Sequence, residues 1–207
     1  MGLPPFEILP GGSDHLVNPF PSCSKGAELF QRIEPFLATL NLIRQTPSKM
    51  GSVIKELHSF SLEELLGNSI AKVDMADAVK AGLFLAVDAW DEAHGIAQDL
   101  DTVEGSYWHG IVHRREPDAA NSKYWFRRVG DHPVIQLLAG KESRPMLPAT
   151  PAFDEITRSG SWDPFRFIDL CRDCERECLT HLRNELIALQ AREMNLLIGY
   201  CVRMAIE

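Results

Sequence analysis

The sequence predicts an all-α fold, a single-domain, bundle-like array of helices preceded by an irregular N-terminal arm. Apolar residues recur at three- and four-residue steps over most of the chain after Lys25, which is the period of a helix. No run of alternating apolar and polar residues is long enough to indicate a sheet. With 207 residues, 45% of them hydrophobic, the chain can bury one core without disulfides or structural metal ions.

The arm is expected over residues 1–24, which carry five of the thirteen prolines, and the helical domain over residues 25–207. Within the domain, residues 141–161 are rich in proline and predict a long loop. This loop would act either as a lid or simply as a connector.

Capping residues and prolines place the helix ends in order along the chain. The first helix begins near Lys25, and Pro35 is expected to bend it or split it. Ser61 as cap, Glu64 at the capping-box position and Gly67 as stop predict a short helix. Further helices are expected at 74–99, 106–115, 122–128 and from 164 to about 205, the last with a break around 182–184, while 132–138 reads equally as helix or strand.

The stretch GSYWHGIVHRREPDAANSKYWFRRVGDHP, residues 105–133, gathers three of the seven histidines, two of the four tryptophans and two arginine pairs. On a helix, His109, His113 and Glu116 stand in one column, because they are four and then three residues apart. The apolar residues of the same helix are expected to hold it to the core: Tyr107, Trp108, Ile111 and Val112.

The His109–His113 spacing is the one that lets two imidazoles on one helix reach a single metal ion. The zincin motif needs a glutamate directly after its first histidine, and Gly110 stands there instead, so the zincin mechanism is not supported. The predicted ligand set is His109, His113, His94 and Glu116, projecting from facing helices. A divalent zinc, iron, manganese or nickel ion is compatible with it. The alternative is a metal-free, hydrogen-bonded polar network in the core.

His94 falls on the apolar stripe of the 74–99 helix, and Asp91 lies three residues before it. A carboxylate beside an inward-facing imidazole can fix its tautomer and raise its basicity. The predicted catalytic set is therefore Asp91, His94, His109 and His113, acting as acid–base groups or ligands. The alternative for Asp91 and His94 is a pair on the helix surface at the edge of the core.

Residues 105–133 carry a net charge of +2 within a chain of net charge −8. Guanidinium groups match carboxylate and phosphate geometry, so Arg114 and Arg127 are predicted to hold an anionic ligand. Arg115 and Arg128 are assigned to structure, since a cation suits the last turn of a helix. Trp108 and Tyr124 are predicted to line the wall of the pocket. The alternative for the arginines is pairing with the nearby acids Glu116, Asp118 and Asp131.

Cys171, Cys174, Cys178 and His181 resemble a zinc ligand list, but they lie on one predicted helix. Ten helical residues span about 15 Å, whereas a tetrahedral zinc holds its ligands within roughly 4 Å of one another. One ion cannot use all four, so the cysteines are interpreted as small apolar core residues. Five reduced thiols suit a cytoplasmic protein.

Charge and missing motifs exclude several classes of function. A net charge of −8 argues against nucleic acid and anionic lipid as partners. The longest apolar run is too short and too polar to span a membrane, and the N-terminus lacks the pattern of a secretory signal. The chain has no glycine-rich phosphate loop, dinucleotide fingerprint or nucleophile elbow.

The segments WDEAHGIAQ, GSYWHGIVHRREPDAANSKYWFRRVGDHP and WDPFRFIDLC resemble a family of uncharacterised proteins from bacteria and fungi. The resemblance covers residues 88–133 well and the C-terminal helices loosely. It implies that 105–133 is a family hallmark, and it implies no particular activity.

Two classes of function remain. The preferred one is a small-molecule enzyme of hydrolytic or proton-transfer type, with a His/carboxylate pocket between the 74–99 and 106–115 helices and arginines for an anionic substrate. The alternative is a non-catalytic helical protein that binds a partner or forms a homodimer, with a buried His/Asp/Arg network that fixes helix register. Whether the protein is an enzyme is left open at this point.

Overall fold

The computed structural model describes residues 16–45, 48–139 and 150–207, and over these residues it is helical without a strand. The all-α prediction is confirmed. Residues 16–24 form no helix, as expected for the arm, and residues 1–15 lie outside the described residues. The helices are α1 (Lys25–Leu37), α2 (Gly51–Ser59), α3 (Leu62–Leu66), α4 (Val73–Ala86), α5 (Trp90–Asp99), α6 (Val103–Arg115), α7 (Ala119–Val129), α8 (Pro133–Ala139), α9 (Pro151–Ile156), α10 (Pro164–Glu177) and α11 (Thr180–Ile206).

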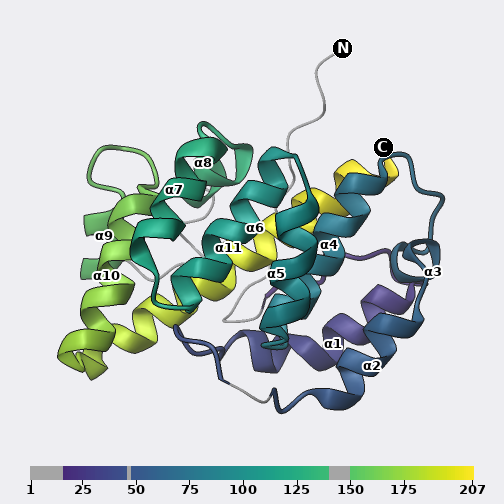
Figure 1. The fold of residues 1–207 in the computed structure, drawn as a ribbon, viewed down its shortest axis with the longest axis horizontal. Helices are drawn as coiled ribbons and strands as arrows, with labels where there is room; N and C mark the ends of the chain where they lie inside the picture. The colour runs from purple at the N-terminus through teal and green to yellow at the C-terminus, as the bar shows by residue number, and fades with distance from the viewer. Residues whose placement is uncertain (1–15, 46–47, 140–149) are drawn as a thin grey trace.

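Helix α6 lies at the centre of the molecule, and every residue of it after Val103 is buried. It packs against α4, α5, α7 and α10, while the long helix α11 runs diagonally behind it and contacts α4, α8, α9 and α10 (Figure 1). One continuous cluster of buried apolar side chains extends from α1 to α11. The histidines and arginines of α6 therefore sit inside the helical array. No helix in the described part of the chain is long and apolar enough to cross a membrane.

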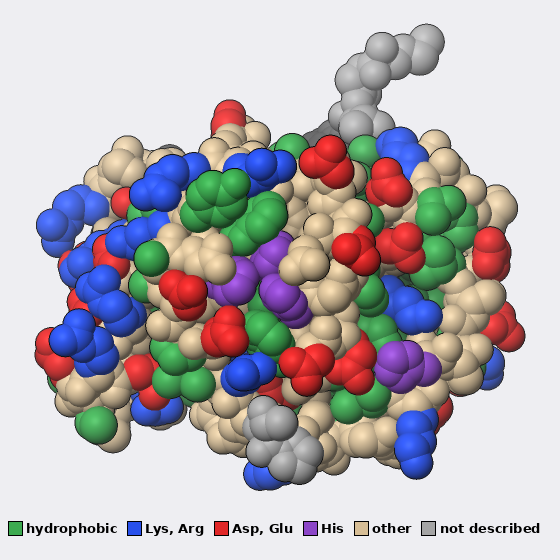
Figure 2. Space-filling view, viewed as in Figure 1, with side chains coloured by type: hydrophobic (Ala, Val, Ile, Leu, Met, Phe, Trp, Pro, Cys, Tyr) green, Lys and Arg blue, Asp and Glu red, His purple; other side chains and the backbone are tan. Residues whose placement is uncertain are grey.

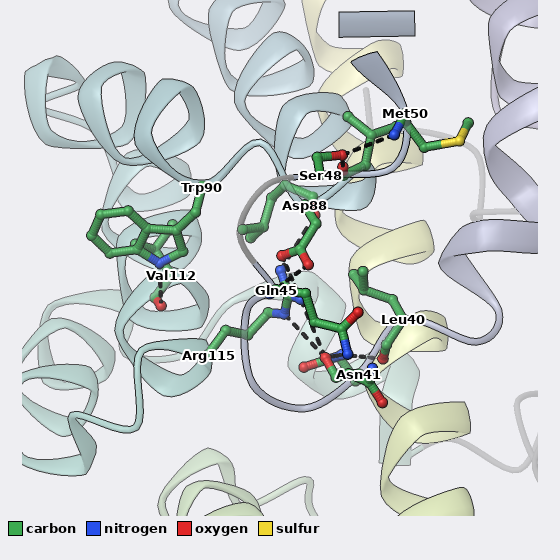
Figure 3. A network of polar contacts seen from close by, with 12 residues as sticks. Leu40, Asn41, Gln45, Ser48, Met50, Asp88, Trp90, Val112 and Arg115 are labelled. Atoms are coloured by element: carbon green, nitrogen blue, oxygen red, sulfur yellow. Dashed lines mark hydrogen bonds and ion pairs between the residues drawn. The ribbon is translucent and has the colours of Figure 1, made fainter. Parts of the chain in front are cut away.

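The predicted helix 74–99 is wrong in one respect, because the chain divides it into α4 and α5 at Asp88. Asp88 has a left-handed backbone conformation with φ of 60°. Its buried carboxylate accepts hydrogen bonds from Arg115 Nη2 at 2.9 Å and from the backbone N–H of Gln45 at 2.7 Å (Figure 3). These tertiary bonds outweigh the apolar periodicity that runs through the junction.

The C-terminal break also differs from the prediction. It lies at Cys178, which ends α10 with a φ of 54°, and not at 182–184. Cys171 and Cys174 are buried as predicted, but Cys178 is exposed, so its assignment to the core is wrong. The sequence predicts one continuous helix through all three cysteines, but the left-handed turn at Cys178 ends α10 there.

Several smaller boundaries shift because caps lie earlier than the apolar pattern suggests. Thr102 caps α6 by accepting from Gly105 N, and Asp118 caps α7 in the same way from Asn121 N. Pro35 neither splits nor ends α1, since the helix continues for two more residues to Leu37. The ambiguous segment 132–138 falls almost entirely in α8.

The predicted long loop 141–161 contains α9, which Thr150 caps and Pro151 begins. Ala152, Phe153 and Ile156 of α9 are buried in the core, so this part is a packed helix and not an irregular loop. The rest of the predicted loop up to residue 149 lies outside the described residues.

Candidate functional site

Three histidines meet where α5, α6 and α7 pack together. His94 comes from α5, and His109 and His113 come from adjacent turns of α6. Each histidine offers one ring nitrogen as a ligand atom, and these three nitrogens lie within 4.8 Å of one another. Figure 2 shows histidine side chains gathered near the centre of one face, with acidic side chains around them. The predicted contact between the two helices is therefore present, and His94 takes part in it.

Trp90, one turn before His94 on α5, fixes this side of the cluster. Its indole N–H donates to the carbonyl oxygen of Val112 on α6 at 3.1 Å. Its ring stacks on His94 with ring centroids 4.7 Å apart and an interplanar angle of 9°. On the outer side, the guanidinium of Arg44 lies 4.2 Å from the Trp90 ring. His94 is held in place by packing against an anchored ring.

Helix α7 closes the opposite side of the cluster. Trp125 stacks on His109 with centroids 4.0 Å apart. The helices can approach this closely because Gly110 has no side chain, and a Cβ there would lie 2.7 Å from the Phe126 ring. Ser122 Oγ also donates to the Gly110 carbonyl at 2.7 Å. Gly110, which stands where a zincin has its glutamate, is thus required for packing.

The partners of His113 select one of its tautomers. Its Nδ1 lies 3.2 Å from Glu116 Oε2, which can only accept a hydrogen bond while it is ionised. The amide nitrogen of Asn121, which can only donate, lies 3.1 Å from Nε2 of His113 and 3.4 Å from its Nδ1. The Glu116 contact fits an imidazole that carries its proton on Nδ1 and a lone pair on Nε2. An unprotonated nitrogen is what a metal ion or a proton acceptor requires.

Burial keeps the α6 histidines uncharged. Desolvation, together with the neighbouring His113 and His94, lowers the pKa of His109 to about 4. Desolvation and His94 also lower the pKa of His113, against the opposing effect of Glu116. Nδ1 of His109 is moreover buried without a hydrogen-bond partner. His109 and His113 therefore present neutral imidazoles at neutral pH, and His109 has an unsatisfied nitrogen.

The low pKa of His109 predicts a loss of stability in acid. The unfolded chain binds this proton near pH 6.5 and the folded chain only near pH 4, so stability falls as the pH falls between these values. The difference of the two pKa values corresponds to about 3 kcal/mol of unfolding free energy. We expect urea unfolding of His109→Leu, measured with a chelator present, to lose less stability than the native chain between pH 7 and pH 4. Parallel pH profiles for the two proteins would contradict this assignment.

Two predicted site residues do not join the cluster. The side chain of Asp91 is 85% exposed, and its nearest cation is Arg44 at 3.9 Å. Among the described residues no hydrogen bond joins it to His94, because the i, i+3 spacing leaves Asp91 on the outer face of α5. Glu116, predicted as a metal ligand, instead bonds to His113 Nδ1 and is not one of the three clustered residues.

Arg114 is not at an open pocket, contrary to the prediction. Its side chain is 1% exposed and pairs with the fully buried Glu193 of α11 at 2.5 Å. Arg115 is buried as well, and it pairs with Asp88 at 2.9 Å. The structural role predicted for Arg115 is thus present, but its partners lie far away in the sequence and are not the nearby acids Glu116, Asp118 and Asp131. Arg114 is held as an internal ion pair and is not free to bind a ligand.

The residues predicted to line the pocket do not lie together in the structure. Trp108 is buried in the core beside Gly82, where a Cβ would lie 2.5 Å from its ring. Tyr124 is 50% exposed and contacts Trp125 edge-on. Arg127 is exposed on α7, with its guanidinium 6.0 Å from the Phe165 ring. Arg128 lies at the surface, 5.3 Å from the Trp125 ring. The rings that stack on the clustered histidines are those of Trp90 and Trp125, and not those of the predicted Trp108 and Tyr124.

The predicted site did not include Trp90, Trp125 or Asn121. A signal for Trp90 exists, since it stands four residues before His94 and so on the same helix face. Trp125 and Asn121 reach the cluster because α7 folds back on α6, and their spacing from His109 and His113 carries no such signal.

Comparison with protein-family models, with curated proteins and with solved structures gives no significant match. The resemblance of residues 88–133 to a family of bacterial and fungal proteins stays a prediction.

Proposed function

We propose that His94, His109 and His113 bind one divalent metal ion. The observation that carries the proposal is that ligand nitrogens from all three lie within 4.8 Å of one another, on helices fixed by packing. A tetrahedral zinc with bonds of about 2.0–2.1 Å holds its ligands roughly 3.4 Å apart, so the nitrogens have to approach by at most about 1.4 Å. We propose that rotations of the three side chains close this difference when the ion binds.

The electrostatics of the cluster support the same proposal. Neutral imidazole is the form that binds a metal, and burial keeps His109 neutral at neutral pH. The contact between Glu116 and His113 is the carboxylate–histidine arrangement that orients imidazole ligands. Asn121, which bonds to the Nε2 of His113, would have to release it when the ion binds. Acidic side chains near the cluster attract a cation (Figure 2).

Three histidines leave one position of a tetrahedral ion open, as catalytic zinc sites do. Imidazole ligands suit zinc, iron and nickel better than the oxygen-seeking magnesium or calcium. Such an ion supplies Lewis-acid chemistry and lowers the pKa of water. We therefore propose a small-molecule enzyme of hydrolytic or proton-transfer type, in which Trp90 and Trp125 flank the reacting centre and keep the histidines in place.

Metal content tests this function. The native protein, purified without added metal and then titrated with Zn²⁺, is expected to hold one ion per chain. The variant His109→Ala/His113→Ala should hold none while keeping its helical circular dichroism. A matched variant, His58→Ala/His181→Ala, removes two exposed histidines and should bind like the native chain. Absence of stoichiometric binding in the native chain, with zinc, iron, manganese and nickel alike, would reject the metal site.

Glu116→Gln is predicted to weaken metal binding without abolishing it. The amide keeps the shape of Glu116 but loses the charge that orients His113, and loss of such a supporting group typically costs 10- to 100-fold in affinity. Competition with a chromophoric chelator measures the change. Asp91→Asn, which alters a largely exposed carboxylate near the same cluster, is the matched control and should have the native affinity. An equal effect of both substitutions would contradict the role of Glu116.

A non-catalytic helical protein that binds a partner or forms a homodimer is the second candidate. It is favoured by the buried pairs Arg114–Glu193 and Arg115–Asp88, which join α6 to α11 and to the turn between α4 and α5. On this view the stacking of His94 and His109 on tryptophans is structural packing. The metal titration separates the two candidates, since the second predicts no stoichiometric ion and a large loss of stability in the His109→Ala/His113→Ala variant.

A further inference from the structure

A surface groove lies apart from the histidine cluster, between α7, α8 and the start of α10. It encloses roughly 490 Å³, which is within the range of small-molecule sites. Its lining is mostly apolar, with a few polar groups. The residues used below are Phe126, Arg127, Ile135, Gln136, Trp162 and Phe165.

Arg127 provides an available positive charge at this groove. It is exposed, and no ion pair joins it to another residue in the described part of the chain; its one recorded contact is with the Phe165 ring, 6.0 Å from the guanidinium. The acid in the lining, Asp131, accepts a hydrogen bond from Gln136 Nε2 at 3.0 Å and does not pair with Arg127. In a chain of net charge −8, a guanidinium without an acidic partner at an apolar groove stands out as a recognition element for an anion.

Trp162 provides a second and independent observation. Its side chain is 2% exposed and lines the groove, and its indole N–H is buried with no hydrogen-bond partner. The indole nitrogen itself has almost no exposed surface, so Trp162 contributes to the groove wall through its other atoms. The groove thus combines a mostly apolar lining with a cation.

We propose that this groove binds a small carboxylate with an apolar body. The carboxylate pairs with Arg127, and the apolar body covers Phe126, Ile135 and Phe165. The ligand also packs against Trp162, whose indole signal reports its presence. The site is distinct from the histidine cluster, because its α7 residues are Phe126 and Arg127, whereas Asn121 and Trp125 serve the cluster. It does not depend on metal binding.

Indole N–H signals in a ¹H–¹⁵N NMR titration test the proposal, with 4-phenylbutyrate as the probe and its uncharged amide as the matched ligand. The chain has four tryptophans, and Trp162→Phe identifies the signal of Trp162. The carboxylate is expected to shift this signal saturably and to bind about tenfold more tightly than the amide. Arg127→Gln should lose about tenfold in affinity, whereas Arg176→Gln, an exposed arginine at the far end of α10, should bind like the native chain.

Ser161→Phe, which fills the groove from an exposed position, should abolish binding and leave the melting temperature unchanged. Three results would overturn the proposal. They are a native chain that does not respond to the carboxylate, equal affinity for the carboxylate and the amide, and an unchanged affinity in Arg127→Gln. A response that moves to the Trp90 and Trp125 signals and disappears in His109→Ala would also overturn it, by placing the ligand at the histidine cluster.

Discussion

Glu193→Ala is expected to lower the free energy of unfolding by about 3–5 kcal/mol, as removal of one partner of a buried ion pair does. Glu193 is fully buried and accepts hydrogen bonds from Arg114 Nη2 at 2.5 Å and from the Tyr107 hydroxyl at 3.2 Å. Without it, the Arg114 guanidinium stays in the core with no acid to pair with, and its Nε and Nη1 already have no partner. Urea unfolding followed by circular dichroism measures the loss.

A surface pair supplies the control for this prediction. Arg32 and Glu56 form an ion pair with two hydrogen bonds, but their side chains are 47% and 38% exposed, so Glu56→Ala should cost less than about 1 kcal/mol. The double variant Arg114→Met/Glu193→Met removes both buried charges and should regain much of the stability lost in Glu193→Ala. Equal losses of unfolding free energy in Glu193→Ala and Glu56→Ala would contradict the claim that the buried pair stabilises the core.

Asp88→Ala is expected to have a similarly large effect, about 3–5 kcal/mol, because it leaves the buried Arg115 guanidinium without its acid. The substitution also removes the acceptor of the Gln45 N–H and places alanine at a φ of 60°. The same carboxylate ties the loop before α2 to the turn between α4 and α5 (Figure 3). Thermal and urea unfolding both report the change.

Asp88→Asn separates charge from conformation. Asparagine tolerates the left-handed backbone and keeps an acceptor for Gln45, so it should be less destabilising than alanine. Asp91→Ala, three residues along the chain but 85% exposed, should change stability by less than about 0.5 kcal/mol. If Asp88→Ala were as mild as Asp91→Ala, the break between α4 and α5 would need another explanation.

The sequence predicts the helical class and most helix positions, because periodicity and caps are local signals. The Ser61–Glu64 capping box and the Asp163–Pro164 start of α10 have the predicted form. The break at Asp88 could not be predicted in the same way, since it depends on bonds to Arg115 and Gln45, which are far away in the chain.

The candidate site is predictable to a similar extent. Helical spacing places His109 and His113 in one column, and the stripe on the preceding helix points His94 toward them. The positions of the Arg114 and Glu116 side chains could not be predicted from their spacing in the sequence. Arg114 turns into the core because Glu193 of α11 meets it there, and Glu116 turns back to His113. Both depend on which helices become neighbours, and that is a property of the whole fold.

X-ray absorption spectroscopy of the zinc-loaded protein tests the central claim most directly, because it identifies the ligand atoms. We predict nitrogen ligands at about 2.0–2.1 Å, with the outer-shell signature of imidazole. That signature should be lost in a variant in which His94, His109 and His113 are all replaced by alanine. Sulfur ligands at about 2.3 Å, or a spectrum unchanged in that variant, would show that the ion binds elsewhere and would contradict the trihistidine site.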